Sequence, residues 1–306
     1  MIEVLRAGPL ATIQDLGRPG WRDRGVSLGG ALDELALQAG NLLVGNAPGA
    51  AGLEFTLGPA VLRFQADTWV ALTGTDTDAS LDGRPLRPGW RSPAHAGQVL
   101  KLAAPRGRMR SYVTVSGGIA VEPVLGSRST DLKAGFGGLW GRALRDGDLL
   151  PVGEARRSPT RPSGLCLPEW SPVVRVLPGP DHPDFSAATR ASFESTDWVV
   201  TPQSNRMGYR LAGPVLMRQR GGELVSHGVL PGVVQVPASG QPIVLLADAP
   251  TTGGYPIIAI VIRADLWKLA QMPLGAALRF QACTQQDAIT AWREQQRLLA
   301  GWRNAL

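Results

Sequence analysis

Three polar segments of the sequence combine side chains that can bind or activate a carboxyl or amide group. The first of them places Thr12, Gln14, Asp15 and Arg18 within seven residues, next to glycines that let a backbone approach a ligand closely. A guanidinium held by a neighbouring carboxylate presents a planar fork of donors that matches a second carboxylate. Segment 12–18 therefore predicts either a loop that binds a carboxyl or amide group, with Arg18 oriented by Asp15, or an ordinary polar turn with a surface ion pair.

The second segment, 204–210, contains Arg206 and Tyr209, which can bind a carboxyl or carbonyl oxygen, and Gly208, which leaves space beside them. The alternative for this segment is a β-hairpin with exposed arginines. Farther along the chain, Gln235 is a polar residue within a predicted strand, so it points either into a pocket or to solvent.

The third segment, 245–256, ends an apolar strand with Asp248, and Thr251, Thr252 and Tyr255 follow before the next apolar strand. A carboxylate at the end of a core strand is partly desolvated, which suits it to proton transfer. The alternative is that Asp248 hydrogen-bonds to its own backbone and stabilises a turn. We favour ligand binding for this segment.

Ten residues make up the predicted site, and we expect those from 12–18 and 248–255 to line one pocket. The predicted catalytic residues are Asp248 as the candidate base, Tyr255 and Asp15. The predicted substrate-binding residues are Thr12, Gln14, Arg18, Arg206, Gln235, Thr251 and Thr252. Arg18 or Arg206 is expected to hold a substrate carboxylate.

Several kinds of chemistry have no motif in the sequence. It contains neither the glycine-rich loop G-x-x-x-x-G-K-[ST] that binds ATP phosphates nor the G-x-S-x-G turn of serine hydrolases. The three histidines, His95, His182 and His227, are far apart and have no partner at ligand spacing, so we expect no metal site. No lysine lies between two methionines, so we expect no biotin on this chain.

Composition narrows the class of protein further. The formal net charge is +6 and the pI is near 10.0, but the basic residues are scattered and do not alternate with aromatics, so we expect no nucleic-acid binding. The two cysteines form no disulfide framework, and no apolar run is long enough for a signal peptide or a membrane span. A cytoplasmic protein without membrane contact is expected.

Short strands with tight turns must position these segments. Glycine (38) and proline (25) together make up about a fifth of the 306 residues, which is typical of many strands and few helices. The hydrophobic pattern predicts seven strands, at 68–73, 98–102, 111–116, 173–177, 232–236, 242–246 and 257–262. It predicts helices near 32–43, 184–193 and 287–303. Asp33 lies near the start of the first, and Thr284 with Asp287 resembles a capping box at the start of the last. A mainly β fold of paired barrels or sandwiches is therefore expected.

The chain also shows signs of an internal duplication. Five prolines between Pro151 and Pro172 predict a linker, and similar strand and turn patterns recur in the same order on its two sides. We therefore predict an N-terminal domain over 1–160 and a C-terminal domain over 170–306, the latter with a terminal helix.

Several stretches along nearly the whole chain are similar to one family. The matching stretches are 12–18, 29–33, 41–46, 54–59, 116–119, 126–130, 141–149, 206–214, 234–237 and 248–262. Taken in order, they resemble the allophanate-hydrolase-subunit-2-like, or biotin-dependent carboxyltransferase, family, which includes KipA-type proteins and the C subunit of 5-oxoprolinase.

The resemblance implies two cyclophilin-like β-barrel domains and obligate partners, namely the KipI-like B subunit of 5-oxoprolinase and its separate A subunit. Together such subunits cleave 5-oxo-L-proline to L-glutamate as ATP is hydrolysed. We expect ATP to act at the level of the complex, at a site outside this chain. Two alternatives follow from the same family: a carboxyltransferase component of a biotin-dependent urea or amide carboxylase, and a KipA-type regulatory protein that antagonises a KipI-like inhibitor.

Overall fold

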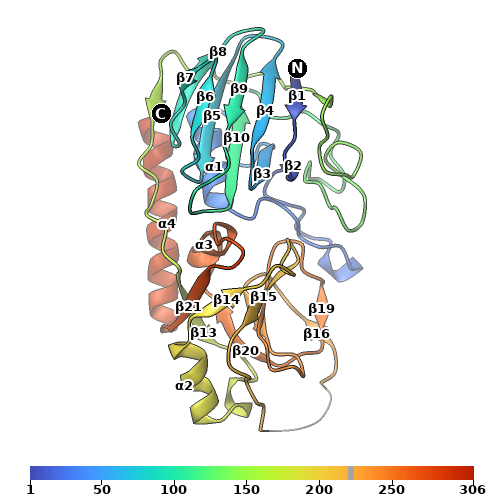
Figure 1. The fold of residues 1–306 in the computed structure, drawn as a ribbon, viewed down its shortest axis with the longest axis vertical. Helices are drawn as coiled ribbons and strands as arrows, with labels where there is room; N and C mark the ends of the chain where they lie inside the picture. The colour runs from blue at the N-terminus through green and yellow to red at the C-terminus, as the bar shows by residue number, and fades with distance from the viewer. Residues whose placement is uncertain (220–223) are drawn as a thin grey trace. The chain divides into compact units, whose positions relative to one another are not determined.

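The computed structural model describes residues 1–219 and 224–306 of the chain. In this part the chain forms two compact units, built mostly of strands together with four α-helices (Figure 1). The mainly β fold with a few helices is therefore confirmed. Unit 1 comprises 1–18, 29–169 and 298–306, and unit 2 comprises 19–28 and 170–297.

Two short segments lie outside the sequence ranges predicted for their units. Segment 19–28 belongs to unit 2, where the side chains of Arg22 and Ser27 donate hydrogen bonds to backbone carbonyls. Segment 298–306 belongs to unit 1, where Leu306 packs against a buried apolar cluster. Hydrogen bonds and apolar contacts made far along the chain thus decide the unit to which each segment belongs.

The described strands of unit 1 form two antiparallel sheets of six strands each. The first sheet has the order β11 (Leu149–Leu150), β1 (Ile2–Arg6), β4 (Ala60–Phe64), β9 (Val99–Leu102), β6 (Ala79–Leu81) and β7 (Arg84–Pro85). The second sheet has the order β12 (Ser163–Gly164), β8 (Trp90–Ala94), β5 (Thr68–Gly74), β10 (Arg110–Val115), β3 (Gly52–Thr56) and β2 (Leu10–Gln14). Because β12 falls within 151–172, part of the predicted linker forms an edge strand.

The two sheets of unit 1 share one apolar core. Alternate residues of the second sheet, such as Ile13, Phe55 and Val113, point into it, as do Val4 and Leu62 of the first sheet. Burying each such side chain contributes about 1.5–3 kcal/mol, so the period-2 pattern of the strands fixes which face of each sheet is inside.

Helix α1 (Glu34–Leu43) covers the other face of the second sheet, against β5 and β10 (Figure 1). It begins where the Oδ1 of Asp33 accepts a hydrogen bond from the backbone N–H of Ala36 at 2.8 Å, which satisfies a donor that the first helical turn leaves unpaired. The helix predicted near 32–43 is therefore confirmed.

In unit 2 the described strands close into a barrel of seven strands. Its order is β13 (Val173–Pro178), β20 (Ile257–Val261), β17 (Val233–Gln235), β18 (Ile243–Leu245), β15 (Gly208–Ala212), β14 (Trp198–Val200) and β21 (Ala277–Ala282). The parallel pair of β21 with β13 closes the ring. Beside it, β16 (His227–Gly228) pairs with β19 (Thr252–Gly253).

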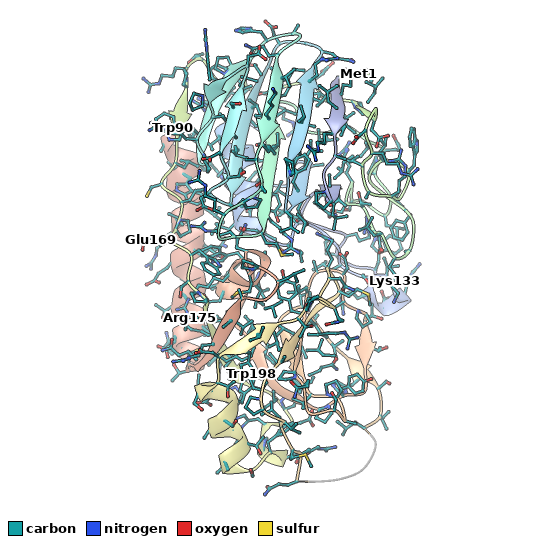
Figure 2. All side chains as sticks on the ribbon, viewed as in Figure 1. Met1, Trp90, Lys133, Glu169, Arg175 and Trp198 are labelled. Atoms are coloured by element: carbon teal, nitrogen blue, oxygen red, sulfur yellow. The ribbon has the colours of Figure 1, made fainter. Side chains whose placement is uncertain are left out.

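Aromatic side chains pack inside this barrel and beneath α2 (Ala187–Ser195). Trp198 is completely buried among the strands (Figure 2), and its Nε1 donates to the carbonyl of Phe193 at 2.9 Å. The ring of Phe193 stacks on that of Phe280, with centroids 4.6 Å apart. Since α2 supplies Phe193, the short helix predicted near 184–193 covers the apolar core of the barrel.

Two further helices begin in unit 2, of which one starts as the sequence indicates and the other was not predicted. Helix α4 (Gln285–Ala305) starts with a capping box, in which the N–H of Asp287 donates to Thr284 Oγ1 at 3.1 Å and the N–H of Thr284 donates to Asp287 Oδ2 at 2.9 Å. Helix α3 (Leu266–Ala270) is short. Single 3-10 turns occur at Arg22–Arg24, His182–Asp184 and Arg263–Asp265.

Candidate functional site

Two of the predicted residues of unit 1, Thr12 and Gln14, lie on one face of β2 and are buried. The Nε2 of Gln14 donates to Thr12 Oγ1 at 3.1 Å and to the carbonyl of Thr130 at 3.2 Å. Its Oε1 is buried and has no hydrogen-bond partner among the residues that the structure describes. Leaving a buried acceptor without a hydrogen bond costs about 1–3 kcal/mol of folding free energy. A ligand that donates a hydrogen bond to this amide oxygen would recover that cost.

Asp15, which follows β2 directly, ties this strand to segment 127–130. Its Oδ1 accepts hydrogen bonds from the hydroxyls of Ser127 and Ser129, each at 2.6 Å, and from the N–H of Gly17 at 2.8 Å. Its Oδ2 accepts from the N–H of Arg128 at 2.6 Å. With four donors, this carboxylate organises the loop around it.

Arg18 is fully buried in the same cluster. One of its terminal nitrogens donates to the carbonyl of Ser129, and its guanidinium lies over the ring of Phe136, 4.8 Å from the centroid. Because Ser129 also donates its hydroxyl to Asp15, one link between the predicted pair Asp15 and Arg18 passes through this serine. At Gly137, a Cβ would lie 2.2 Å from the Ser129 carbonyl oxygen, so only glycine leaves that carbonyl in place.

A buried polar row that was not predicted lies on the face of the second sheet that α1 covers. Glu54 of β3 lies directly opposite both Thr12 of β2 and Tyr112 of β10, and its Oε2 accepts from the Tyr112 hydroxyl at 2.7 Å. The guanidinium of Arg110 lies 3.8 Å from the Glu54 carboxylate. Burial, followed by the charge of Glu54, raises the pKa of Tyr112 well above its usual value, so the phenol stays protonated.

This row has a signal in the sequence. Polar residues alternate with apolar ones in 12–14, 54–56 and 112–114, and an alternating pattern is usually interpreted as one buried and one solvated face. Here α1 covers the polar face, so both faces of the sheet are buried.

In unit 2, Arg206 and Asp248 form a buried two-point ion pair. Arg206 Nε lies 2.8 Å from Asp248 Oδ2, and its Nη2 lies 3.0 Å from Oδ1. The backbone N–H of Asp248 also donates to the carbonyl of Arg206 at 3.1 Å. The residues predicted separately as carboxylate binder and base therefore contact each other.

Segment 248–252 is held in place by 19–28 of the same unit. The hydroxyl of Ser27 donates to the carbonyl of Ala249 at 3.1 Å, and the guanidinium of Arg22 donates to the carbonyls of Pro250, at 3.3 Å, and Val229. Burial lowers the pKa of Arg22. These contacts fix the backbone that carries Asp248.

The other predicted residues of unit 2 differ in exposure. Gln235 is buried, its Nε2 contacts the Tyr255 carbonyl at 3.5 Å, and Gly253 packs against it so closely that a Cβ there would lie 2.7 Å from Nε2. Thr251 is half-buried, whereas Thr252 and Tyr255 are exposed. Tyr255 also borders a surface pocket of about 400 Å³ beside β15 and β18.

The structure thus brings only some of the ten predicted residues together. Thr12, Gln14, Asp15 and Arg18 form one buried cluster in unit 1. In unit 2, Arg206 contacts Asp248 and Gln235 contacts Tyr255. A single pocket lined by residues of both units stays a prediction.

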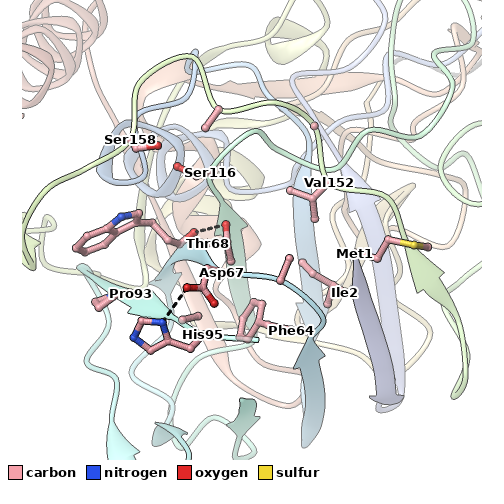
Figure 3. Close-up of a pocket in the computed structure, with 15 residues that line it drawn as sticks. Met1, Ile2, Phe64, Asp67, Thr68, Pro93, His95, Ser116, Val152 and Ser158 are labelled. Atoms are coloured by element: carbon pink, nitrogen blue, oxygen red, sulfur yellow. Dashed lines mark hydrogen bonds and ion pairs between the residues drawn. The ribbon is translucent and has the colours of Figure 1, made fainter. Parts of the chain in front are cut away.

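A larger pocket, of about 490 Å³, lies elsewhere on unit 1 and contains no predicted residue. His95 and Asp67 form an exposed pair on its wall, with His95 Nδ1 3.2 Å from Asp67 Oδ2 (Figure 3). The hydrogen bonds from the Ala96 N–H and His95 lower the pKa of Asp67.

Neither a metal centre nor a membrane span is found in the described part of the chain. Among residues 1–219 and 224–306, no set of three or more histidine, cysteine, aspartate or glutamate side chains is arranged to hold a metal ion. Across the same residues, no helix combines the length and apolar character needed to cross a membrane.

Comparisons with known proteins gave concordant matches. Residues 24–282 match the family model described as carboxyltransferase domain, subdomain A and B. The chain is 50% identical over 305 residues to the C subunit of 5-oxoprolinase from Escherichia coli strain K12, covering 99% of this chain and 98% of that protein. It is 42% identical to the protein of the same name from Haemophilus influenzae, over 97% of this chain and 96% of that protein.

More distant matches come from larger proteins. A putative urea carboxylase of Emericella nidulans is 33% identical over 98% of this chain, which covers 25% of that protein. Among solved structures, the urea amidolyase of K. lactis superposes with a TM-score of 0.92 at 27% identity, over 98% of this chain and 20% of that chain.

Proposed function

The chain belongs to the family of carboxyltransferase domains with subdomains A and B, and we propose that it is a subunit of an ATP-dependent 5-oxoprolinase. The observation that carries the proposal is the 50% identity to the C subunit of a 5-oxoprolinase, which extends over nearly all of both chains. In this proposal the complex is a hydrolase of a cyclic amide, and this chain works only with its partners. Those partners are the B subunit, which is KipI-like, and the separate A subunit.

The polar groups of the two units suit the proposed substrate. 5-Oxoproline carries a planar lactam N–C=O and a carboxylate, so it needs amide or hydroxyl groups for the lactam and a cation for the carboxylate. Gln14 and Thr12 offer the first kind in unit 1, and Arg18 and Arg206 offer the second. Opening the ring adds one water across the C–N bond, which gives the γ-carboxylate and the amine of glutamate.

We assign the base of this reaction to Asp248. Arg206 holds its carboxylate in one orientation through two contacts, at 2.8 and 3.0 Å. Tyr255 is exposed nearby in sequence and supplies a hydroxyl that can donate to the lactam oxygen. Asp15 acts by organising its loop, since its carboxylate already accepts four hydrogen bonds.

ATP enters the proposal at the level of the complex. This chain contains no glycine-rich phosphate loop, so we assign the nucleotide site to another subunit. We propose a cytoplasmic complex, in keeping with the two free cysteines, Cys166 and Cys283.

A second candidate function is carboxyl transfer to urea or an amide from biotin on a partner. The observation in its favour is the 33% identity to a putative urea carboxylase, together with the TM-score of 0.92 to a urea amidolyase. Urea and the lactam share the planar N–C=O group, so one set of donors suits either.

The two functions are separated by the substrate that drives ATP hydrolysis in the complex purified with this chain. We expect ADP release to depend on 5-oxoproline and to be unaffected by urea with bicarbonate. ADP release that requires urea and bicarbonate, with a biotinylated protein in the complex, would establish the second function instead.

A further inference from the structure

The buried row of Glu54 and Tyr112 contacts a segment that leads back to the candidate site of unit 1. Tyr112 is fully buried and Glu54 is 1% exposed, and the proposed reaction uses neither of them. Buried polar networks of this kind are costly unless fully hydrogen-bonded, and they specify one arrangement of the chain. The segment that the network holds therefore has one fixed position.

Glu54 and Tyr112 hold the backbone of 29–33, which we call the strap. Glu54 Oε2 accepts from the N–H of Leu32 at 2.9 Å, and the Tyr112 hydroxyl accepts from the N–H of Asp33 at 2.8 Å. Because the same hydroxyl donates to Glu54, the two side chains and two amides form one connected set of hydrogen bonds.

The strap in turn lies against the loop that carries Asp15 and Arg18. The N–H of Ala31 donates to the carbonyl of Asp15 at 2.9 Å. At Gly30, a Cβ would lie 2.8 Å from the backbone nitrogen of Gly17, and at Gly29 it would lie 3.0 Å from a terminal nitrogen of Arg18. A shift of the strap therefore moves this loop directly.

We propose that Glu54 and Tyr112 are positioning residues for the reaction, which act on the Asp15–Arg18 loop through the strap. The inference rests on the proposed function for its kinetic consequence, but the hydrogen bonds that carry it belong to this chain alone. Neither residue is expected to touch the substrate. Misplacing binding groups by about 1 Å costs up to 10²-fold in rate, which sets the size of the expected effect.

The kinetic test is Tyr112→Phe in the assembled complex. We expect the KM for 5-oxoproline to rise about tenfold or more while the KM for ATP stays unchanged. When Arg18→Lys is already present, Tyr112→Phe should raise the KM for 5-oxoproline much less than it does alone, because both changes act on one loop. Glu54→Gln, which keeps an acceptor for Leu32, should retain more activity than Glu54→Ala.

The matched control is Thr73→Val. Thr73 lies opposite Tyr112 in the same sheet and is equally buried, but its hydroxyl donates to the carbonyl of Ala36 in α1, at 2.7 Å, instead of contacting the strap. It should lower stability without changing the KM for 5-oxoproline. An equal KM increase in Thr73→Val, or lower stability with unchanged KM in Tyr112→Phe, would overturn the positioning role.

Hydrogen exchange of the chain separates failure of this inference from failure of the proposed function. Tyr112→Phe should speed amide exchange at 29–33 and at 15–18 more than elsewhere in unit 1. Unchanged exchange in these two segments would overturn the inference even if the complex turns over 5-oxoproline. A wild-type complex without turnover would contradict the proposed function, and exchange would still decide the role of the strap.

Discussion

The carbonyl of Ser129 is placed by a glycine that no other residue can replace. Gly137 has a φ of 70°, and a Cβ there would meet the Ser129 oxygen at 2.2 Å and an Arg18 nitrogen at 3.0 Å. Gly126 has a similar φ of 80° but open space around its Cβ position. An alanine at either position would therefore have a strained backbone, but only an alanine at 137 would also collide with neighbouring atoms.

We predict that Gly137→Ala destabilises the protein by about 2 kcal/mol more than Gly126→Ala, since both pay the left-handed strain of about 1–2 kcal/mol and only the first displaces a carbonyl. Denaturant unfolding of the two variants measures the difference. Gly137→Ala should also lower turnover of the complex, because the displaced carbonyl is the one that holds Arg18. Equal stability of the two variants would contradict the tight placement of Ser129.

A test of the Arg206–Asp248 pair needs a control that distinguishes a catalytic role of Asp248 from a role in the stability of the fold. Breaking a buried ion pair costs about 3–5 kcal/mol whatever its function. Unit 2 offers a second pair with a buried carboxylate, in which Arg175 Nη2 lies 2.7 Å from Asp265 Oδ1, Asp265 is 1% exposed and the Arg175 side chain is 34% exposed. Asp265 is not in the candidate site.

We predict that Asp248→Asn lowers turnover per folded complex by about 10²–10⁴-fold, as expected for loss of a general base, whereas Asp265→Asn lowers stability and keeps turnover. Glutamate release, normalised to the folded fraction, measures the effect. If both variants retain turnover, Asp248 is not the base.

At the scale of elements, Asp265 joins strand β13 to the turn that precedes α3. Burial alone would raise its pKa, but the hydrogen bonds from the Arg175 side chain and backbone, with the charge of Lys268, outweigh burial and lower it. Because the pKa of Asp265 is lower in the folded state, its ionised carboxylate stabilises the fold at pH values above the ordinary pKa near about 4. This contribution to stability is lost as the pH falls through the lowered pKa.

We therefore predict that the stability difference between wild type and Asp265→Asn is largest near about pH 7 and shrinks below about pH 4. Urea unfolding at several pH values measures it. A difference that is constant down to about pH 3 would show that the Asp265 hydrogen bonds do not depend on its charge.

Elements with strong local signals were predictable from the sequence. Thr284 and Asp287 indicated the start of α4, and the two hydrogen bonds of the capping box confirm it. Asp33 caps α1 as expected. The strands expected at 68–73 and 257–262 correspond to β5 and β20 within one residue at each end.

The polar face of the second sheet could not be predicted in the same way. The alternation of Glu54 with its apolar neighbours Leu53 and Phe55 is the same whether water or a helix covers the polar side. Only the packing of α1 decides, and that depends on contacts between residues far apart in the chain. Segment 19–28 belongs to unit 2 for a similar reason, because its side chains donate hydrogen bonds to backbone carbonyls far along the chain.

At the scale of the whole molecule, the candidate residues are divided between the two units. Unit 1 provides the cluster around Arg18, and unit 2 provides the Arg206–Asp248 pair. The residue types in both groups were predictable from the sequence, whereas the pairing of Arg206 with Asp248 required the barrel. This division agrees with a chain that functions as one part of a larger complex.

The most direct test of the central claim is glutamate release from 5-oxoproline and ATP by this chain mixed with its partner subunits, compared with mixtures that each lack one component. The expected result is turnover by the full mixture that disappears when this chain is omitted and returns when it is added back. Turnover that persists without this chain, or none from a verified full complex, would contradict its assignment as a 5-oxoprolinase subunit.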